Sequence, residues 1–140
     1  MNLLQEITNY QPFNLQEAHD KECIIDFITN HADCLERKNQ TAHITTSIWT
    51  INKDCTKTLM VYHNIYDSWS WIGGHADGNE DLRSVALREL QEETGVGHAT
   101  LITPDIFSLE TLTVNGHIKN GVYVPSHLHM NITLALQFLL

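Results

Sequence analysis

The chain has 140 residues, a length that fits one domain with a single hydrophobic core. Its 17 acidic residues outnumber 8 basic ones and give a net charge of −9, which argues against a nucleic-acid polymer as ligand, because clustered Lys and Arg hold phosphate backbones. No apolar run approaches the ~20 residues that span a bilayer, and the N-terminus lacks the features of a signal peptide. Three scattered cysteines indicate reduced thiols, so we expect a cytoplasmic protein without membrane contact.

Helical signals dominate residues 1–40. Asn14 is a favourable N-cap for a helix over residues 15–31, in which apolar side chains recur at helical spacing. Pro12 separates this helix from a shorter one near residues 2–9, because proline disrupts a helix. We therefore expect a helical N-terminal extension ahead of the rest of the domain.

Strand signals begin at residue 42. Residues 42–51 and 57–63 are rich in strand-forming side chains, and the Asn-Lys-Asp turn sequence between them predicts a hairpin. Residues 69–72 predict a short strand that enters the pair Gly73-Gly74 and carries two tryptophans on one face.

The second half of the chain alternates helix, loop and strand. A helix is predicted over residues 80–94, closed by Gly95 as the left-handed cap residue. Strands are predicted over residues 102–113 and 127–138, with a turn or loop over residues 115–121. The last strand alternates at the two-residue period of a half-buried strand. Its apolar face consists of Leu128, Met130, Ile132, Leu134, Leu136 and Phe138.

Three carboxylates near the end of the helix lie on its inward stripe. At ~100° per residue, Glu89, Glu92 and Glu93 continue the side that earlier turns fill with apolar residues. Acids at this spacing repel one another, and the partial negative charge of the helix C-terminus adds to the conflict. A hard cation such as Mg²⁺, which prefers oxygen ligands, would remove it. The alternative is a solvated acidic face. The apolar members of the stripe are Leu82, Val85 and Ala86.

A longer pattern surrounds these acids. It consists of Gly74, five residues, Glu80, seven residues, Arg88-Glu89-Leu90, one residue, Glu92-Glu93, one residue and Gly95-Val96. This matches every position of the Nudix box, so the chain resembles the Nudix hydrolases over residues 74–96. Residues 71–78 look like the approach to the box in many bacterial members, and residues 126–131 resemble a downstream strand. The resemblance thus extends over about residues 42–140.

The resemblance implies an α/β (α+β) fold, a Nudix-like α/β/α sandwich with a mixed β-sheet. A single domain 1–140 would comprise the helical extension 1–40 and a Nudix core 42–140. Two features depart from the family pattern. Ile72 stands where many members have proline, and the usual second helix after the last strand is missing because the sequence stops at Leu140. Apolar side chains in residues 137–140 then favour docking or truncation over a free tail.

By the same resemblance, the box residues have catalytic roles. One of the glutamates is expected to help activate water, and Arg88 to orient a box carboxylate. Glu80 is implied in a supporting role near the metal or the loop. The expected cofactor is Mg²⁺ or Mn²⁺. The metal site is assigned to Glu89, Glu92, Glu93 and Gly74.

Several residues around the box are candidates for substrate binding. His75 follows the double glycine and is placed to contact phosphate, while Trp71 is suited to stack on a nucleobase. His127 and His129 share the polar face of the last strand and are also candidates for an extra base or ligand. The alternatives are core packing for the tryptophan and ordinary surface polarity for the histidines. The full set is Gly73, Gly74, His75, His127, His129 and Trp71.

The implied activity is metal-dependent hydrolysis of a diphosphate linkage in a nucleoside diphosphate derivative, such as a nucleoside triphosphate or nucleotide sugar, by attack of water at phosphorus. The alternative is a non-catalytic Nudix-fold module that binds a nucleotide or sugar diphosphate; the intact Arg88 and box acids favour the enzyme. A third reading, isomerisation of a diphosphate ester, lacks the usual extra cysteine and glutamate. The expected partner is a small-molecule diphosphate, and a homodimer is common in the family.

Overall fold

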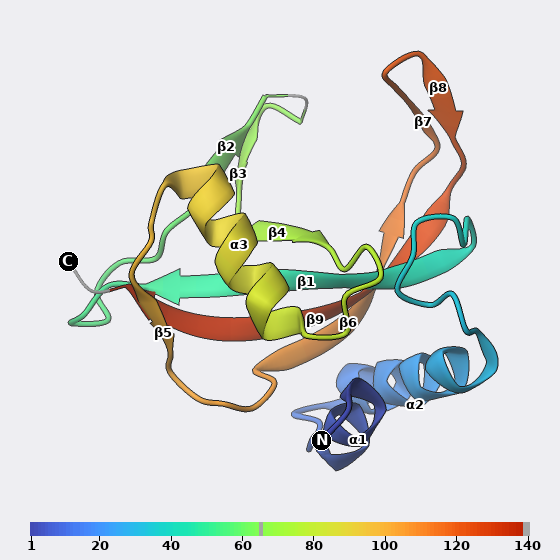
Figure 1. The fold of residues 1–140 in the computed structure, drawn as a ribbon, viewed down its shortest axis with the longest axis horizontal. Helices are drawn as coiled ribbons and strands as arrows, with labels where there is room; N and C mark the ends of the chain where they lie inside the picture. Colours follow the sequence, from blue (N-terminus) through green and yellow to red (C-terminus); the bar gives the residue numbers. More distant parts are fainter. Residues whose placement is uncertain (65, 139–140) are drawn as a thin grey trace.

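A mixed β-sheet forms the centre of the molecule (Figure 1). The computed structural model describes residues 1–64 and 66–138. The long strands β1 (Ala42–Ile51) and β9 (His127–Phe138) run parallel to each other, and β4 (Ile72–His75) pairs antiparallel with the other edge of β1. The predicted α/β architecture with a mixed sheet is confirmed.

The free edge of β9 carries two shorter strands in succession. β5 (Ala99–Leu101) pairs with its C-terminal end, and β6 (Ser108–Val114) pairs with its first half, both antiparallel. The single strand predicted over residues 102–113 is therefore wrong at its start. Residues 102–107 form an irregular crossing between the two strands, and Pro104 within it has no N–H to donate to a ladder.

The alternation in β9 divides the sheet into two faces. Met130, Ile132, Leu134 and Leu136 are buried in the core, as their spacing predicts. Neighbouring residues in register share a face, so the even-numbered residues of β1, such as Ile44, join them. Odd-numbered residues of both strands point to the opposite face. We call these two surfaces the even face and the odd face of the sheet.

Helix α3 (Leu82–Thr94) packs on the even face over β4 and β1 (Figure 1). Its N-cap is Asp81, whose side chain accepts a hydrogen bond from the Ser84 backbone N–H, so the helix starts two residues later than predicted. Gly95 adopts φ +77° and ends the helix as expected. The core-facing residues are Leu82, Val85, Ala86 and Leu90.

Two N-terminal helices confirm the helical prediction for this region. α1 (Leu3–Asn9) and α2 (Leu15–Asn30) are capped by Asn2 and Asn14, and α2 packs against β6. Glu17 on α2 is buried, and its carboxylate accepts hydrogen bonds from the backbone N–H groups of Phe13 and Leu109. None of the helices in the described part of the chain is long and apolar enough to cross a membrane.

The hairpin predicted between residues 42–51 and 57–63 is wrong. The turn forms, but pairing with β1 stops at the isolated bridge between Ile51 and Thr58. The chain then forms a separate hairpin from β2 (Val61–His63) and β3 (Ser68–Ser70). The strand predicted over residues 69–72 is consequently divided, and its two tryptophans lie on different segments: Trp69 is in β3, whereas Trp71 lies between β3 and β4.

A second hairpin replaces the loop predicted over residues 115–121. β7 (His117–Lys119) pairs with β8 (Val122–Val124) across Asn120 and Gly121, which have φ of 52° and 78°. Asn-Gly is a strong signal for a tight hairpin turn, because both residues tolerate positive φ. The apolar C-terminal tail expected at residues 137–140 falls partly on residues 139 and 140, which lie outside the described residues.

Candidate functional site

Gly74 of β4 lies directly beside the side chain of Glu89 at the acidic end of α3. A Cβ atom placed on Gly74 would lie 2.5 Å from Cδ and 2.7 Å from Oε1 of Glu89. Any larger residue would therefore displace the carboxylate. Glycine at this position lets the backbone of β4 approach the Glu89 side chain directly.

Glu89 is also held by its neighbour in sequence. Arg88 Nη2 lies 3.5 Å from Glu89 Oε1, and the two side chains are 46% and 18% exposed. The guanidinium thus faces solvent while the carboxylate is turned toward the sheet. This arrangement agrees with the orienting role that the resemblance implies for Arg88.

Burial on α3 ends at Leu90. Glu92 and Glu93 are exposed, so only Glu89 of the three acids continues the inward stripe as part of a half-buried surface. The departure arises because the core beneath the helix stops one turn before the helix does. Although Glu93 reaches solvent, neighbouring atoms remove part of the hydration of its carboxylate. This desolvation, and then the charges of Glu89 and Glu92, raise the pKa of Glu93 to about 7.

These donors suit a hard divalent cation. Three carboxylates spaced at i, i+3 and i+4 supply oxygen ligands on one side of the helix. The only basic group paired with them in the described ion pairs is Arg88. Desolvation, followed by repulsion from Glu89 and Glu92, raises the pKa of Glu93, so the ionised form is disfavoured at this position. A cation of the Mg²⁺ type would provide the missing charge.

Glu80 has a different partner. Its Oε1 accepts a hydrogen bond of 2.9 Å from the backbone N–H of Leu3, the first residue of α1. That N–H has no acceptor within its own helix, so Glu80 completes the N-terminus of α1. The first acid of the box therefore fastens the N-terminal helix to the loop before α3.

The predicted histidines meet on the odd face of the sheet. His75, His127 and His129 are joined there by His43 of β1, which sequence reasoning missed. We call these four residues the histidine cluster. Ring centroids of His43 lie 5.2, 4.9 and 5.0 Å from those of His75, His127 and His129. Because residues alternate along β4, the cluster and Glu89 lie on opposite faces.

Burial lowers the pKa of three of these histidines, namely His43, His75 and His129. Desolvation lowers the pKa of His43, and together with nearby positive groups it lowers the pKa of His75 to about 4. The same desolvation, with the neighbouring histidines, lowers the pKa of His129 to about 3. These rings are therefore neutral at pH 7 and expose nitrogen lone pairs rather than positive charge.

A buried polar network continues the odd face beyond the histidines. Asn131 is 2% exposed, and its Oδ1 accepts hydrogen bonds from the hydroxyls of Thr45 (2.9 Å) and Ser47 (3.0 Å). The indole N–H of Trp71 donates to Ser47 Oγ at 3.0 Å. This contact anchors Trp71 to the sheet, while Gly73 leaves room beside Ser47. The alternating polar residues of β9 predicted a polar face of the sheet, but not that Asn131 is buried within it.

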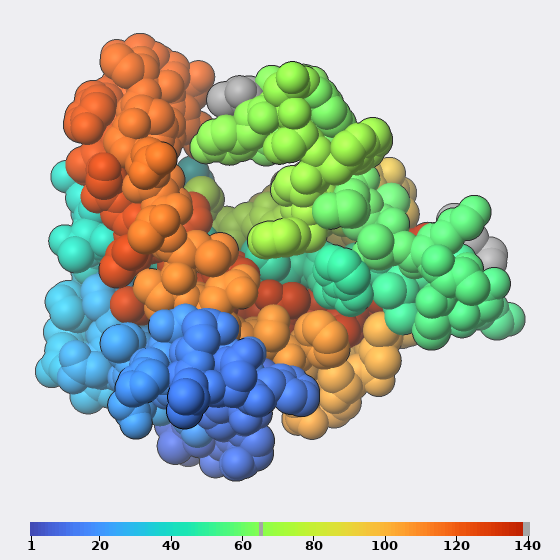
Figure 2. Space-filling view, turned by 180° about the vertical axis from the view of Figure 1, so that it is seen from behind, coloured from blue at the N-terminus to red at the C-terminus, as the bar shows by residue number. Residues whose placement is uncertain are grey.

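Two hairpins project from the sheet near the histidine cluster. Figure 2, seen from the side opposite α3, shows an opening between the β7–β8 hairpin and the β2–β3 hairpin. Both hairpins carry exposed aromatic side chains, among them Trp69 (67% exposed) and Tyr123 (64% exposed).

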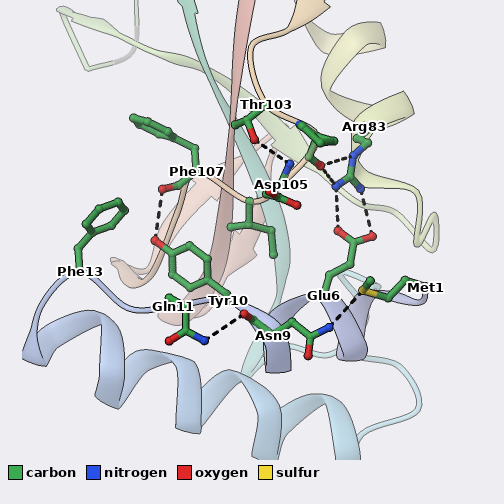
Figure 3. A pocket seen from close by; sticks show the side chains of 12 residues that line it. Met1, Glu6, Asn9, Tyr10, Gln11, Phe13, Arg83, Thr103, Asp105 and Phe107 are labelled. Carbon is green, nitrogen blue, oxygen red and sulfur yellow. Dashed lines mark hydrogen bonds and ion pairs between the residues drawn. The ribbon is translucent and has the colours of Figure 1, made fainter.

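A further pocket lies between α1 and the segment that leads into β6 (Figure 3). Arg83 of α3 donates two hydrogen bonds, of 3.1 and 3.0 Å, to the carboxylate of Glu6 and also contacts the carbonyl of Pro104. Tyr10 Oη lies 3.2 Å from the carbonyl oxygen of Phe107. None of the predicted site residues is among the described residues that line this pocket. Its polar groups hold the N-terminal helices in place.

Comparison with known proteins adds a family assignment. The NUDIX domain family model matches residues 41–123, more than half of the chain. A 39-residue stretch is 54% identical to "Nudix hydrolase 27, chloroplastic" of Arabidopsis thaliana; it covers 28% of this chain and only 17% of that protein.

Solved structures with a similar arrangement have low sequence identity. A NUDIX-family hydrolase from Clostridium perfringens is 21% identical, with a TM-score of 0.46, and the match covers 68% of this chain and 69% of that one. The dihydroneopterin triphosphate pyrophosphohydrolase of E. coli is 20% identical, with a TM-score of 0.48 and 66% coverage of both chains. The C. elegans Ap4A hydrolase is 23% identical, with a TM-score of 0.40, covering 66% of this chain and 67% of that one.

Proposed function

We propose that this chain, which belongs to the NUDIX domain family, catalyses the metal-dependent hydrolysis of a diphosphate linkage in a nucleoside diphosphate derivative. The observation that carries the proposal is the contact between Glu89 and Gly74 at the end of α3. It places one carboxylate against bare backbone, with two more carboxylates one turn further along the same helix. A helix end with this charge is unfavourable unless a cation binds there.

Glu89, Glu92 and Glu93 would hold Mg²⁺ or Mn²⁺, with the backbone of Gly74 beside them. When bound, such an ion supplies positive charge against the phosphoryl oxygens and makes water more acidic. Arg88 positions Glu89 through their ion pair and, being largely exposed, can also meet an anionic substrate. The acidic surface of the chain thereby becomes compatible with a phosphorylated ligand.

Glu93 is our candidate to accept the proton of the attacking water, through the carboxylate oxygen that a bound ion would leave free. In the proposed reaction, the oxygen of water forms a new bond to one phosphorus as its proton passes to a Glu93 carboxylate oxygen. The P–O bond to the bridging oxygen breaks, and the leaving phosphate or nucleotide keeps the electron pair. Positioning of water and phosphorus by the box residues supplies most of the acceleration.

The remainder of the substrate would lie at the edge strand β4, whose two faces are both reachable from its outer side. Gly73 and Trp71 are the candidates there, because Trp71 is 46% exposed and is fixed by its hydrogen bond to Ser47. A fixed, half-exposed indole is suited to stack on a base. His75, His127 and His129 point away from Glu89, which argues against direct contact with the reacting phosphate.

The test is a panel of nucleoside triphosphates, ADP-ribose, dinucleoside polyphosphates and diphosphate alcohols, incubated with Mg²⁺ or Mn²⁺ and assayed chromatographically for the nucleotide or phosphate-ester products. We expect metal-dependent turnover of at least one substrate and its loss in Glu92→Gln. Glu22→Gln, an exposed glutamate on α2, is the matched control and should retain full activity. Tight binding of a panel member without turnover would support the non-catalytic binding module instead.

A further inference from the structure

Four imidazoles from three strands converge at one end of the odd face. His43 comes from the start of β1, His75 from the end of β4, and the remaining pair from the start of β9. One ring nitrogen from each of His43, His75 and His129 lies within 4.8 Å of the others. His127 Nε2 lies 3.1 Å from His129 Nε2. The cluster therefore brings nitrogen donors from three strands close to one another.

The outer nitrogens of two rings are already bonded in a way that fixes their tautomers. His43 Nδ1 lies 3.1 Å from the carbonyl oxygen of Asn39, and His127 Nδ1 lies 2.8 Å from that of Pro125. A carbonyl only accepts, so each Nδ1 carries the proton and each Nε2 carries a lone pair. Metal-binding histidines usually have this arrangement, in which a backbone carbonyl orients the ring from behind.

The inward nitrogen of His43 is left without a partner. His43 is 4% exposed, and its Nε2 is buried with no hydrogen-bond partner among the described residues. An acceptor in this state costs free energy unless a donor or cation reaches it. Protonating all four rings would not solve the problem, because like charges with ring centroids about 5 Å apart repel one another.

We propose that the histidine cluster binds one Zn²⁺ ion, with His43, His75 and His129 as ligands and His127 as the fourth. Imidazole nitrogen suits Zn²⁺, whereas Mg²⁺ prefers oxygen, so this site is distinct in chemistry from the box. Nitrogens bound to a tetrahedral Zn²⁺ at ~2.05 Å are about 3.3 Å apart, close to the separation already present between His127 and His129. Modest rotation of the other two rings would complete the coordination.

The position of the site suggests its effect. Zn²⁺ there would join β1, β4 and β9 at the point where the chain leaves the sheet for the β7–β8 hairpin. Closed coordination by four protein ligands is typical of a structural zinc rather than a catalytic one. The ion would thus stabilise the strand ends from which the β7–β8 hairpin projects, beside the opening seen in Figure 2, and the site does not depend on the proposed hydrolysis.

The test is titration of the full-length, metal-free protein with Co²⁺ followed by Zn²⁺, read by visible absorption. We expect one equivalent of Co²⁺ to give the intense bands of tetrahedral coordination, and Zn²⁺ to displace it. His129→Gln should weaken binding by more than about 100-fold, because loss of an outer-sphere partner alone costs about 10–100-fold. His98→Gln, at an exposed histidine outside the cluster, is the control and should bind as the wild type does.

Two further measurements separate this site from the box and from misfolding. The double variant Glu92→Gln/Glu93→Gln should keep the cobalt spectrum even if it no longer hydrolyses any substrate. X-ray absorption of the zinc-loaded wild type requires no substitution and should show at least three imidazole ligands. An oxygen-only shell, binding equal in wild type and a folded His129→Gln, or loss of the spectrum in the double glutamate variant would each overturn the zinc site.

Discussion

Gly74 and His75 are neighbours in β4 yet belong to different faces of the sheet. Gly74 lies under the carboxylate of Glu89 on the α3 side, whereas His75 joins three other imidazoles on the opposite side. The first region offers exposed and half-exposed oxygen donors, and the second offers neutral nitrogen donors in a half-buried setting. Strand alternation thus lets one short edge strand serve two regions with different metal preferences. The difference predicts that changes on one face leave the other intact.

The largest separation of the two regions should come from Glu93→Gln. The substitution removes the group proposed to accept a proton, a role that contributes about 10²–10⁴-fold to a rate. We expect kcat for substrate hydrolysis to fall by about 10²–10⁴-fold, with no change in Co²⁺ binding at the histidine cluster. A variant that retains wild-type kcat would remove Glu93 from the reaction.

Gly74→Ala tests the α3 side through the backbone. The new methyl group would collide with Glu89 Cδ, and displacement of a catalytic group by about 1 Å can cost about 10²-fold in rate. Steady-state kinetics should show this loss while the melting temperature changes little. Gly97→Ala is the control, because nothing lies within 4 Å of its Cβ position. Full activity in Gly74→Ala would show that the Glu89 contact is dispensable.

The pH dependence of Mg²⁺ binding should also distinguish the two faces. Because the pKa of Glu93 is raised to about 7, its proton competes with the metal at lower pH. Affinity measured by calorimetry should rise about fivefold between pH 6 and pH 7, about twofold more by pH 8, and then level off. The proton must leave for the cation to bind, so the change runs upward with pH. A flat response over this range would mean that Glu93 is not a ligand.

The smallest effect is expected at Trp71, which lies just before β4 and is bonded to Ser47 on the odd face. Trp71→Phe keeps an aromatic ring but removes the hydrogen bond to Ser47, worth about 1 kcal/mol. We expect KM to rise about fivefold with kcat unchanged. A fall in kcat instead would place the indole near the reacting phosphorus.

The sequence predicted what local patterns determine. The period of α3, its cap at Gly95 and the spacing of the box acids all lie within one continuous segment. The alternation of β9 likewise identified its buried face. The β7–β8 hairpin was missed although Asn120 and Gly121 supply a strong local signal. An available turn sequence was thus overlooked rather than absent.

Contacts between residues that are far apart in the chain could not be predicted from such local patterns. His43 has no sequence neighbour that marks it as part of a site, and it meets His129 only because β1 and β9 run parallel in one register. The burial of Asn131 and the bond from Glu80 to Leu3 depend on the same kind of contact. The exposure of Glu92 and Glu93 follows from where the core ends beneath α3, which helical geometry alone does not give.

The central claim is that the acidic end of α3 binds a divalent cation. Electron paramagnetic resonance of Mn²⁺ added to the full chain, with and without a non-hydrolysable nucleoside triphosphate analogue, tests it most directly. We predict that wild type takes up Mn²⁺ and loses free-ion signal, more strongly with nucleotide, and that Glu92→Gln/Glu93→Gln does not. Equal free Mn²⁺ in both proteins would contradict the account.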